Sequence, residues 1–155
     1  MAVESTGMTL RAEPARPHDL KGALDVLGRS ELSDRDVADG WGHYFVVRED
    51  DGRVVGVAGL EVHGEDGLLR SVAVEPDYRG LGLGSSLIGA ALDRATLLKL
   101  RSIYLLTTTA REYFARHGFA DCPRDEAPEP IRASWEFSAG CPSTAAFMKR
   151  ALDRP

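Results

Sequence analysis

A strand, a glycine-rich loop and an amphipathic helix follow one another between residues 68 and 98, and this order constrains the chain more than any other feature. The apolar run from Leu68 to Val74 is typical of a strand. Pro76 ends the strand because proline has no N–H to donate to a sheet ladder. A loop with Gly80, Gly82 and Gly84 follows. Apolar residues then recur at helical spacing, at Leu87, Ile88, Ala91, Leu92, Ala95 and Leu98.

This arrangement predicts an anion-binding loop from Arg79 to Ser86. The first amides of a helix have no partner within the helix, and the helix dipole adds partial positive charge there. Glycines let a phosphate approach the backbone closely. Two familiar phosphate motifs are excluded. A dinucleotide fingerprint would need glycine at Ser85 or Leu87, and the sequence has no Gly-Lys-Ser/Thr triplet.

The loop resembles the acetyl-CoA loop of the GNAT acetyltransferases, whose pattern is Arg/Gln-x-x-Gly-x-Gly/Ala after a strand ending Val-x-Pro. Arg79, Gly82 and Gly84 match that pattern, and the preceding strand ends at Val74-Glu75-Pro76. The resemblance implies acetyl-CoA as co-substrate and no metal ion. It also implies that the following residues bind the cofactor: Val72, Ala73, Val74, Arg79, Gly80, Leu81, Gly82, Leu83, Gly84, Ser85 and Ser86.

Length and composition limit the number of domains, the partners and the location that the chain can have. The 155 residues suit one domain, expected over 1–155 with its core at about 8–152. A net charge of −5 argues against nucleic acid as a partner. The sequence shows no membrane-length apolar run, and residues 1–7 do not read as a signal peptide, so we expect a cytoplasmic protein. We expect frayed ends at 1–7 and 153–155.

The order of expected elements resembles the GNAT fold over nearly the whole chain. Short hairpins make the strands from 44 to 74 an antiparallel meander, and a helical crossover makes the next strand parallel. We therefore expect an α/β fold with a mixed, mostly antiparallel sheet of about six to seven strands flanked by helices. A splayed central parallel pair should leave a ligand crevice. Strands are expected at 9–12, 44–48, 54–62, 68–74, 102–107 and 144–152, and helices at 17–29, 34–38, 84–99, 110–117 and 130–137.

A narrower resemblance lies in the second half of the chain. It is carried by the segments 105–110, 113–119 and 130–132, together with Glu136-Phe137 and Cys141-Pro142. These resemble the N-acetyltransferases encoded with arsenic-resistance genes and, more distantly, the catalytic domain of N-acetylglutamate synthase. The resemblance implies acetylation of the amino group of a small amino-acid-like substrate. An organoarsenical such as arsinothricin is one such substrate.

Acetyl transfer to an amine requires a group that removes the amine's proton. The strand at 68–74 carries no acid, although many relatives place a glutamate there. Glu61 on the neighbouring strand is the first candidate for general base, acting directly or through a water. His63 is the second, because its unperturbed pKa suits the task. Both positions also suit a solvated side chain at a strand end.

The leaving thiolate must gain a proton. The family usually has a tyrosine four residues before the glycine of its Gly-Phe pair, and here that position is Phe114. Tyr113 lies one residue earlier, about 100° round the helix. Tyr113 is the candidate general acid, with water as the alternative. Core packing is the expected role of Phe114.

Three residues could hold an acidic acceptor substrate: Arg70, Arg132 and Ser134. In a regular strand Arg70 shares a face with Val72 and Val74, and a charge among apolar neighbours needs a counter-anion. That anion is either a ligand carboxylate or Glu61. Arg132 and Ser134 are expected to begin a helix whose free amides add to an anion site, although a plain surface helix would carry the same residues.

Cys122 and Cys141 raise the question of an acetyl-cysteine intermediate. A catalytic thiol needs a base and an electropositive setting, and the sequence pairs neither cysteine with a histidine. Two cysteines also cannot form a zinc cluster. We expect structural cysteines and direct attack of the amine on acetyl-CoA.

Three functions therefore compete. The leading one is a small-molecule N-acetyltransferase. The second is protein N-terminal or lysine acetylation on the same fold. The third is a catalytically inactive sensor that binds acetyl-CoA, which the phenylalanine at 114 and the ambiguous base would suit. The sequence is compatible with a homodimer, and it does not name the acceptor.

Overall fold

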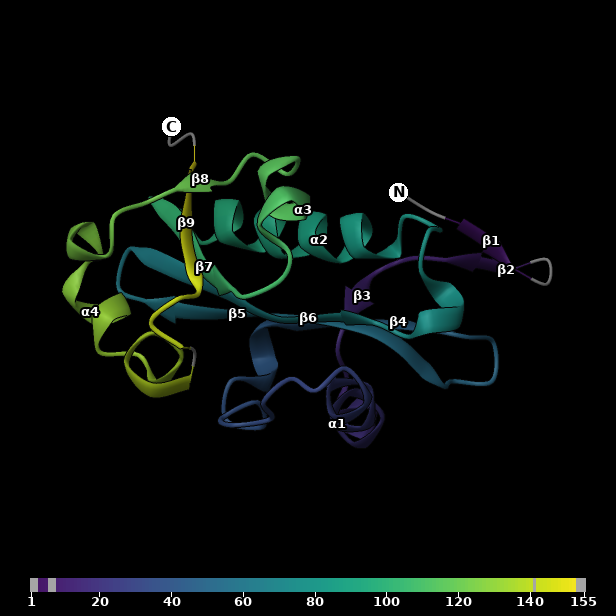
Figure 1. Ribbon diagram of the computed structural model, residues 1–155. Helices are drawn as coiled ribbons and strands as arrows, with labels where there is room; N and C mark the ends of the chain where they lie inside the picture. The colour runs from purple at the N-terminus through teal and green to yellow at the C-terminus, as the bar shows by residue number, and fades with distance from the viewer. Residues whose placement is uncertain (1–2, 6–7, 141, 153–155) are drawn as a thin grey trace. The chain divides into compact units, whose positions relative to one another are not determined.

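The computed structural model describes residues 3–5, 8–140 and 142–152, and its main feature is a seven-stranded mixed sheet (Figure 1). Its strands are β3 (Glu13–Pro14), β4 (Tyr44–Arg48), β5 (Val54–His63), β6 (Asp66–Val74), β7 (Ser102–Thr107), β8 (Ala120–Asp121) and β9 (Ala146–Ala151). The strand order is β3-β4-β5-β6-β7-β9-β8. β6 and β7 pair in parallel, whereas β3 with β4, β4 with β5, β7 with β9 and β8 with β9 pair antiparallel. This confirms the predicted α/β class.

Helices and short turns connect the strands. The α-helices are α1 (Leu20–Arg29), α2 (Leu83–Leu97), α3 (Arg111–Ala115) and α4 (Glu129–Arg132). The 3₁₀ turns are η1 (Pro17–Asp19), η2 (Trp41–His43), η3 (Pro76–Tyr78) and η4 (Arg124–Glu126), and η5 (Glu136–Gly140) is a π-helical turn. A separate hairpin joins β1 (Val3–Ser5) and β2 (Met8–Leu10).

The chain forms two compact units. Unit 1 comprises Met1–Leu60 and Ser71–Arg94, and unit 2 comprises Glu61–Arg70 and Ala95–Pro155. In unit 1, helix α1 covers one face of the strands and α2 the other (Figure 1). The apolar stripe of α1 explains its place, because Ala23, Val26 and Leu27 are fully buried in one cluster with β4 and β5 residues.

The core of unit 2 lies on β7 and β9. These strands pair over their whole length, from Ser102 opposite Ala151 to Thr107 opposite Ala146. Tyr104 and Phe147 stack on this surface with ring centroids 5.4 Å apart. Ile131 of α4 is fully buried in the same cluster, which fixes the C-terminal segment to the sheet. Parallel pairing joins β6 to β7 at Asp66, Gly67 and Leu68.

Strand β6 contains an irregularity that the sequence did not predict. Ser71 has a φ of 59° in mid-strand, a conformation that L-residues other than glycine seldom adopt. Its hydroxyl lies 3.1 Å from the Tyr44 hydroxyl. The turn at Ser71 interrupts the two-residue alternation of the strand. The expectation that Arg70 shares a face with Val72 and Val74 is therefore wrong, because it assumed an unbroken period.

Three other predicted elements differ. The helix expected at 34–38 is a run of turns, since Asp36 has a φ of 62° and the Ser33 hydroxyl accepts a bond from the Arg35 amide. The strand expected at 9–12 is replaced by β2 and β3. The helix expected at 130–137 is divided into α4 and η5. Residues 3–5 form a strand instead of a frayed end, while 1–2, 6–7 and 153–155 lie outside the described residues.

Gly59 provides a test of the packing in unit 1. A Cβ at this position would lie 2.2 Å from the Tyr44 ring, closer than atoms can approach. We expect Gly59→Ala to lower the free energy of unfolding by about 1–3 kcal/mol, the usual cost of overpacking. The control is Gly28→Ala in α1, where a Cβ meets nothing within 4 Å. It should be neutral or stabilising by about 0.5–1 kcal/mol. Urea unfolding of both variants checks this, and equal stability of the two would contradict it.

Candidate active site

The loop between β6 and α2 has the geometry of an anion site. Gly80 and Gly82 have φ values of 81° and 80°, which only glycine adopts without strain. The first helical bond of α2 runs from the Ser86 amide to the Gly82 carbonyl, at 3.1 Å. The amides of residues 83–85 precede that bond, so they have no i−4 carbonyl within the helix. The fifteen-residue helix thus directs its N-terminal amides and its dipole at this loop.

The other predicted cofactor residues flank this loop in unit 1. Ala73 is buried, and Val72 and Val74 are half-buried on β6. The Val74 carbonyl accepts a bond from Nε of Arg79 at 3.0 Å, which fixes the start of the loop. Ser86 has a structural task as well, because its hydroxyl accepts the Ala12 amide at 3.1 Å. With its amide also bonded, Ser86 contributes less to an anion site than the residues before it.

Four polar residues in unit 2 form one connected group, which we call the Arg70 cluster: Glu61, His63, Arg70 and Glu136. Arg70 Nη1 donates to Glu61 Oε2 at 2.6 Å, and Nη2 lies 3.6 Å from Glu136 Oε1. The other Glu61 oxygen, Oε1, lies 2.8 Å from His63 Nε2. The Arg70 side chain is only 2% exposed. Of the two counter-anions that the sequence left open, the structure shows Glu61, with Glu136 in addition.

The surroundings of Glu61 set its acidity. Burial raises the pKa of this carboxyl, but the hydrogen bonds from His63 and Arg70 and the charge of Arg70 together outweigh burial. The net effect is a pKa below the usual range of glutamate. Glu61 is therefore ionised at neutral pH and is a weak base. A weak base with both oxygens occupied is better suited to hold its neighbours than to abstract a proton.

Sequence reasoning missed the part played by Glu136. In the sequence, Glu136 stands next to Phe137 in the C-terminal motif, and no pattern there indicates a role for its carboxylate. The chemistry of Arg70 could have indicated a second acidic partner, because a buried guanidinium needs anionic or hydrogen-bonding partners for its N–H groups. What the sequence could not show is that the π-helical turn η5 brings Glu136 to Arg70 across 66 positions of the chain, from 70 to 136.

Tyr113 and Phe114 lie on α3 in different settings. Phe114 is buried and packs edge-on against Phe119 with centroids 6.1 Å apart, which agrees with its expected core role. Tyr113 is half-buried, with its ring centroid 4.9 Å from that of His117. Gly118, with a φ of 87°, ends this helical segment as expected. The Thr107 hydroxyl accepts the Ala110 amide at 3.0 Å just before this helix, and no side chain caps the helix itself.

Arg132 and Ser134 do not begin a helix. Arg132 is the last residue of the four-residue α4, so the argument from free N-terminal amides is wrong for this pair. Arg132 is exposed, and one Nη donates to the Ala127 carbonyl at 2.9 Å. The buried Ser134 hydroxyl donates to the Ile131 carbonyl at 2.6 Å and accepts the Phe137 amide at 3.3 Å. Arg132 thus has donors to spare, whereas Ser134 serves the turn.

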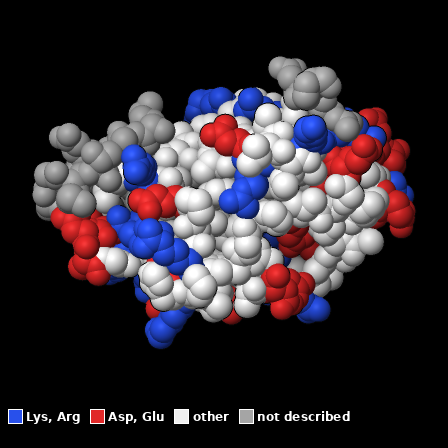
Figure 2. All heavy atoms as spheres, turned by 180° about the vertical axis from the view of Figure 1, so that it is seen from behind, with Lys and Arg blue, Asp and Glu red and all other residues white. Residues whose placement is uncertain are grey.

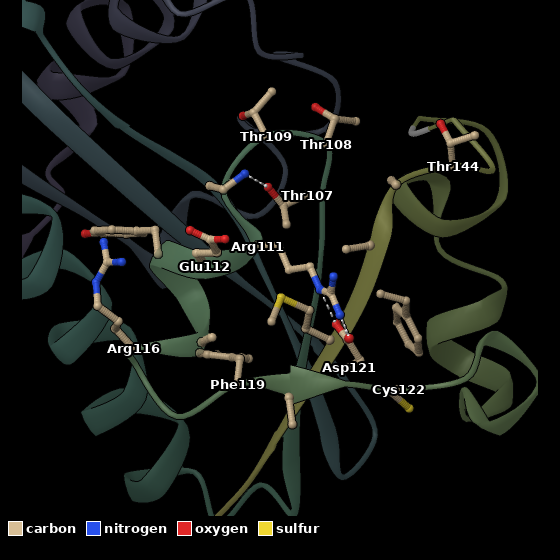
Figure 3. A pocket seen from close by; sticks show the side chains of 18 of the residues that line it. Thr107, Thr108, Thr109, Arg111, Glu112, Arg116, Phe119, Asp121, Cys122 and Thr144 are labelled. Atoms are coloured by element: carbon tan, nitrogen blue, oxygen red, sulfur yellow. Dashed lines mark hydrogen bonds and ion pairs between the residues drawn. The ribbon is translucent and has the colours of Figure 1, made fainter.

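An open pocket of about 1340 Å³ lies in unit 2, between the end of β7, helix α3 and strands β8 and β9 (Figure 3). Threonines 107, 108 and 109 line one end, and Tyr113 is among its lining residues. An ion pair between Arg111 and Asp121 crosses it, as Figure 3 shows. Sequence analysis did not predict this pair. The pocket presents hydroxyls, charges of both signs and apolar surface to a ligand.

Cys122 also lines this pocket and is not an activated thiol. Burial raises the pKa of Cys122, and the charge of Glu126 raises it further. This fits the expected structural role. Cys141, the other cysteine considered, lies outside the described residues. Within the described part of the chain, no group of three or more His, Cys, Asp or Glu residues is arranged to hold a metal ion.

The surface carries no single dominant charge on the face that Figure 2 displays, where basic and acidic side chains are interspersed among uncharged ones. The displayed face therefore has no broad basic patch for a polyanion. The net charge of the chain, −5, likewise does not favour a polyanionic partner. In the residues that the structure describes, no helix has the length and apolar character needed to cross a membrane.

Comparison with known protein families identifies the family to which the chain belongs. The model of the acetyltransferase (GNAT) domain matches residues 40–121, just over half of the sequence. The chain therefore belongs to the GNAT acetyltransferase family, which confirms the prediction made from the loop motif. The matched segment includes the whole β6–loop–α2 junction.

Relatives with curated names include amino-acid acetyltransferases. The enzyme of that name from Ralstonia nicotianae is 32% identical over 123 residues, covering 78% of this chain but 26% of its own length. That of Mycobacterium tuberculosis is 41% identical over 71 residues, covering 45% of this chain and 40% of its own length. The chain thus spans about a quarter to two fifths of the length of these relatives.

Solved structures share the fold. A Mycobacterium tuberculosis protein, Rv2747, in complex with CoA and NLQ matches with a TM-score of 0.80 and 24% identity, covering 92% of this chain and 99% of its own. N-acetylglutamate synthase from Neisseria gonorrhoeae, in complex with coenzyme A and N-acetyl-glutamate, also matches with a TM-score of 0.80. It is 21% identical, covering 94% of this chain and 35% of its own.

The lowered pKa of Glu61 predicts how the Arg70 cluster supports stability. A carboxyl with a depressed folded-state pKa stabilises the fold above its unfolded pKa and loses that contribution as pH falls through the folded value. At pH 7, Glu61→Gln should cost about 1.5–3 kcal/mol, the range for a charged hydrogen bond. The difference from wild type should shrink as the pH falls through the lowered folded-state pKa of Glu61 and should vanish only below it, where both side chains are neutral. Urea unfolding at several pH values measures this, and a pH-independent difference would contradict it.

Proposed function

We propose that the protein is an acetyl-CoA-dependent N-acetyltransferase that acts on the amino group of a small amino-acid-like substrate. The observation that carries this proposal is the junction of β6 and α2, where two glycines in the left-handed region precede the N-terminus of a fifteen-residue helix. Such a junction suits a pyrophosphate. Membership of the GNAT family and the CoA named in two structural neighbours support the cofactor.

The cofactor is assigned to unit 1. We propose that the amides of residues 81–85 bind the pyrophosphate, with Arg79 beside them. The backbone of Val72, Ala73 and Val74 would pair with the pantetheine arm. One of these amides would polarise the thioester carbonyl as its oxygen becomes negative, the role of an oxyanion hole. Ser86 then anchors the loop through its bonds to Gly82 and Ala12.

The acceptor is assigned by the chemistry of unit 2 and by the names of the relatives. Amino-acid acetyltransferases acetylate a substrate that carries a carboxylate as well as an amine, and the same is proposed here. Arg132 is the better candidate ligand for that carboxylate, because it is exposed and has N–H donors beyond those bonded to carbonyls. Arg70 supports the site indirectly, since its counter-charges come from Glu61 and Glu136.

The proposed mechanism is direct attack of the amine on the thioester. The raised pKa of Cys122 gives no support to an acyl-enzyme. Glu61 and His63 are the candidate groups for removal of the amine's proton, and Tyr113 is the candidate donor to the leaving thiolate. The half-buried position of Tyr113 beside the pocket suits that task.

The test of function is to mix the protein with acetyl-CoA and a panel of amines and to measure free thiol together with the acetylated product. Thiol release with free amino acids supports the proposal. Release only with peptides or proteins would favour protein acetylation, and CoA binding without any transfer would favour a sensor. Including arsinothricin tests the narrower prediction of an arsenical acceptor. Measurements on the purified protein in solution also report whether it is a homodimer. A cytoplasmic location is proposed as well.

Gly82 gives a sharp test of the cofactor site. Gly82→Asp places an anion against the proposed pyrophosphate position. Gly82→Asn is its neutral isostere, and both residues tolerate a positive φ. We expect the Asp variant to lose CoA binding by calorimetry and the Asn variant to retain much of it, with both variants folded by circular dichroism. Equal CoA affinity in the two variants would show that the phosphates bind elsewhere.

Arg132 tests the acceptor class. We expect Arg132→Ala to weaken the use of carboxylate-bearing amines by about ten- to a hundred-fold, as loss of a charged hydrogen bond costs about 1.5–3 kcal/mol. Esterifying the acceptor should weaken wild type similarly but barely weaken the variant further. The control is Arg35→Ala, an exposed arginine of unit 1. If wild type acetylates amines lacking a carboxylate equally well, the amino-acid assignment is wrong.

A further inference from the structure

We infer that His63, Glu61 and Arg70 form one catalytic relay, in which His63 takes the proton from the acceptor's ammonium group while Glu61 and Arg70 are positioning residues. Sequence analysis treated Glu61 and His63 as alternatives for one task and Arg70 as a substrate ligand. The geometry joins all three. This inference rests on the proposed acetyl transfer to an amine and deepens it by assigning the base.

The relay is defined by two short contacts on one carboxylate. Glu61 Oε2 accepts Arg70 Nη1 at 2.6 Å, and Glu61 Oε1 lies 2.8 Å from His63 Nε2. Exposure increases along the chain of contacts. The side chain of Arg70 is 2% exposed, that of Glu61 is 22% and that of His63 is 25%. Arg70 therefore fixes Glu61 from the buried side, and His63 is the member most open to a small substrate.

The two contacts decide which member is the base. Both carboxylate oxygens of Glu61 have cationic or N–H partners, and these contacts lower the pKa of Glu61 and make it a weak base. A neutral imidazole that donates Nε2–H to a carboxylate keeps a lone pair on Nδ1. Glu61 also stabilises the imidazolium that forms. This division of labour, with a carboxylate orienting a histidine base, recurs on unrelated folds.

In the proposed acetyl transfer, each proton and each bonding electron pair has a defined destination. An acceptor R–NH₃⁺ gives one proton to Nδ1 of His63. The freed amine forms a C–N bond with the thioester carbonyl carbon, and the C–S bond breaks, leaving the thiolate of CoA. The amide nitrogen loses its second proton, which the thiolate gains through solvent or Tyr113. His63 returns its own proton to water at the end of the cycle.

The charged groups facing His63 and Glu61 come from three elements. Glu61 and His63 are both on β5, Arg70 is on β6 and Glu136 is on η5. With neutral His63 the cluster holds two carboxylates and one guanidinium, so a proton arriving on His63 meets a net negative environment. Removing the charge of Glu61 leaves the protonated histidine with Arg70 and Glu136 alone. The protonated form is then less favoured.

The experiment measures kcat/KM against pH with one amino acid acceptor, for wild type, Glu61→Gln and His63→Asn. His63→Asn should lose about 10²–10⁴-fold, the usual worth of a general base, and should lose the acidic limb of the profile. Glu61→Gln should retain that limb, with a smaller loss of rate. His18→Asn, at an exposed histidine outside the cluster, is the control and should match wild type.

Other outcomes overturn the inference. If Glu61→Gln loses the limb and at least as much activity as His63→Asn, Glu61 itself is the base. If His63→Asn keeps the wild-type profile, no relay operates. Added imidazole should restore part of the activity of His63→Ala, which a merely structural histidine would not allow.

A second readout does not depend on activity. The ¹⁵N NMR shifts of the His63 ring should identify the tautomer with the proton on Nε2 in wild type and show that this preference is lost in Glu61→Gln, and the same tautomer balance in both proteins would contradict the relay. Different results would refute the proposed function and the relay. A wild-type protein that transfers acetyl to no amine refutes the proposed function, and with it the relay. Transfer by wild type with an unaltered His63→Asn profile refutes the relay alone.

Discussion

The backbone amides at the N-terminus of α2, which have no i−4 carbonyl within the helix, are the constraint on which this account depends. A helix of fifteen residues must leave its first amides without internal partners. Here Gly80 and Gly82 turn the chain before the helix through positive φ values that residues with a side chain rarely adopt. The bond from the Val74 carbonyl to Arg79 and the bonds of Ser86 hold the loop at both ends. We propose that an anionic ligand binds these amides.

A second constraint shapes unit 2. A guanidinium as buried as that of Arg70 requires anions, and it recruits Glu61 from β5 and Glu136 from η5. Together with the hydrogen bond from His63, this charge lowers the pKa of Glu61, and it links the π-helical turn to the sheet. Residues that look like three separate candidates in the sequence are therefore one group held together by a buried arginine.

The sequence predicted what depends on local pattern. The bounds of β4 and β7 were correct to the residue, because each is an apolar run between clear breakers, and the loop motif identified the family. It failed where a tertiary contact overrides a local preference. Ser71 adopts a positive φ that no pattern signals, which broke the alternation assumed for Arg70. The helix expected after residue 130 is divided because Ile131 and Phe137 each pack into the core of unit 2. The link between residues 70 and 136 was equally invisible, since only the folded chain creates it.

The most direct test of the central claim is an NMR titration of the isotopically labelled protein with CoA, following the backbone amides one by one. The account predicts that the amides of residues 81–85 shift most on binding and that the Ser86 amide, already bonded to Gly82, shifts less. Loss of these shifts when CoA is replaced by pantetheine, which lacks the phosphates, would assign them to the pyrophosphate. If CoA binds while the amides of residues 81–85 stay unperturbed, the helix N-terminus is not the cofactor site and the account is wrong.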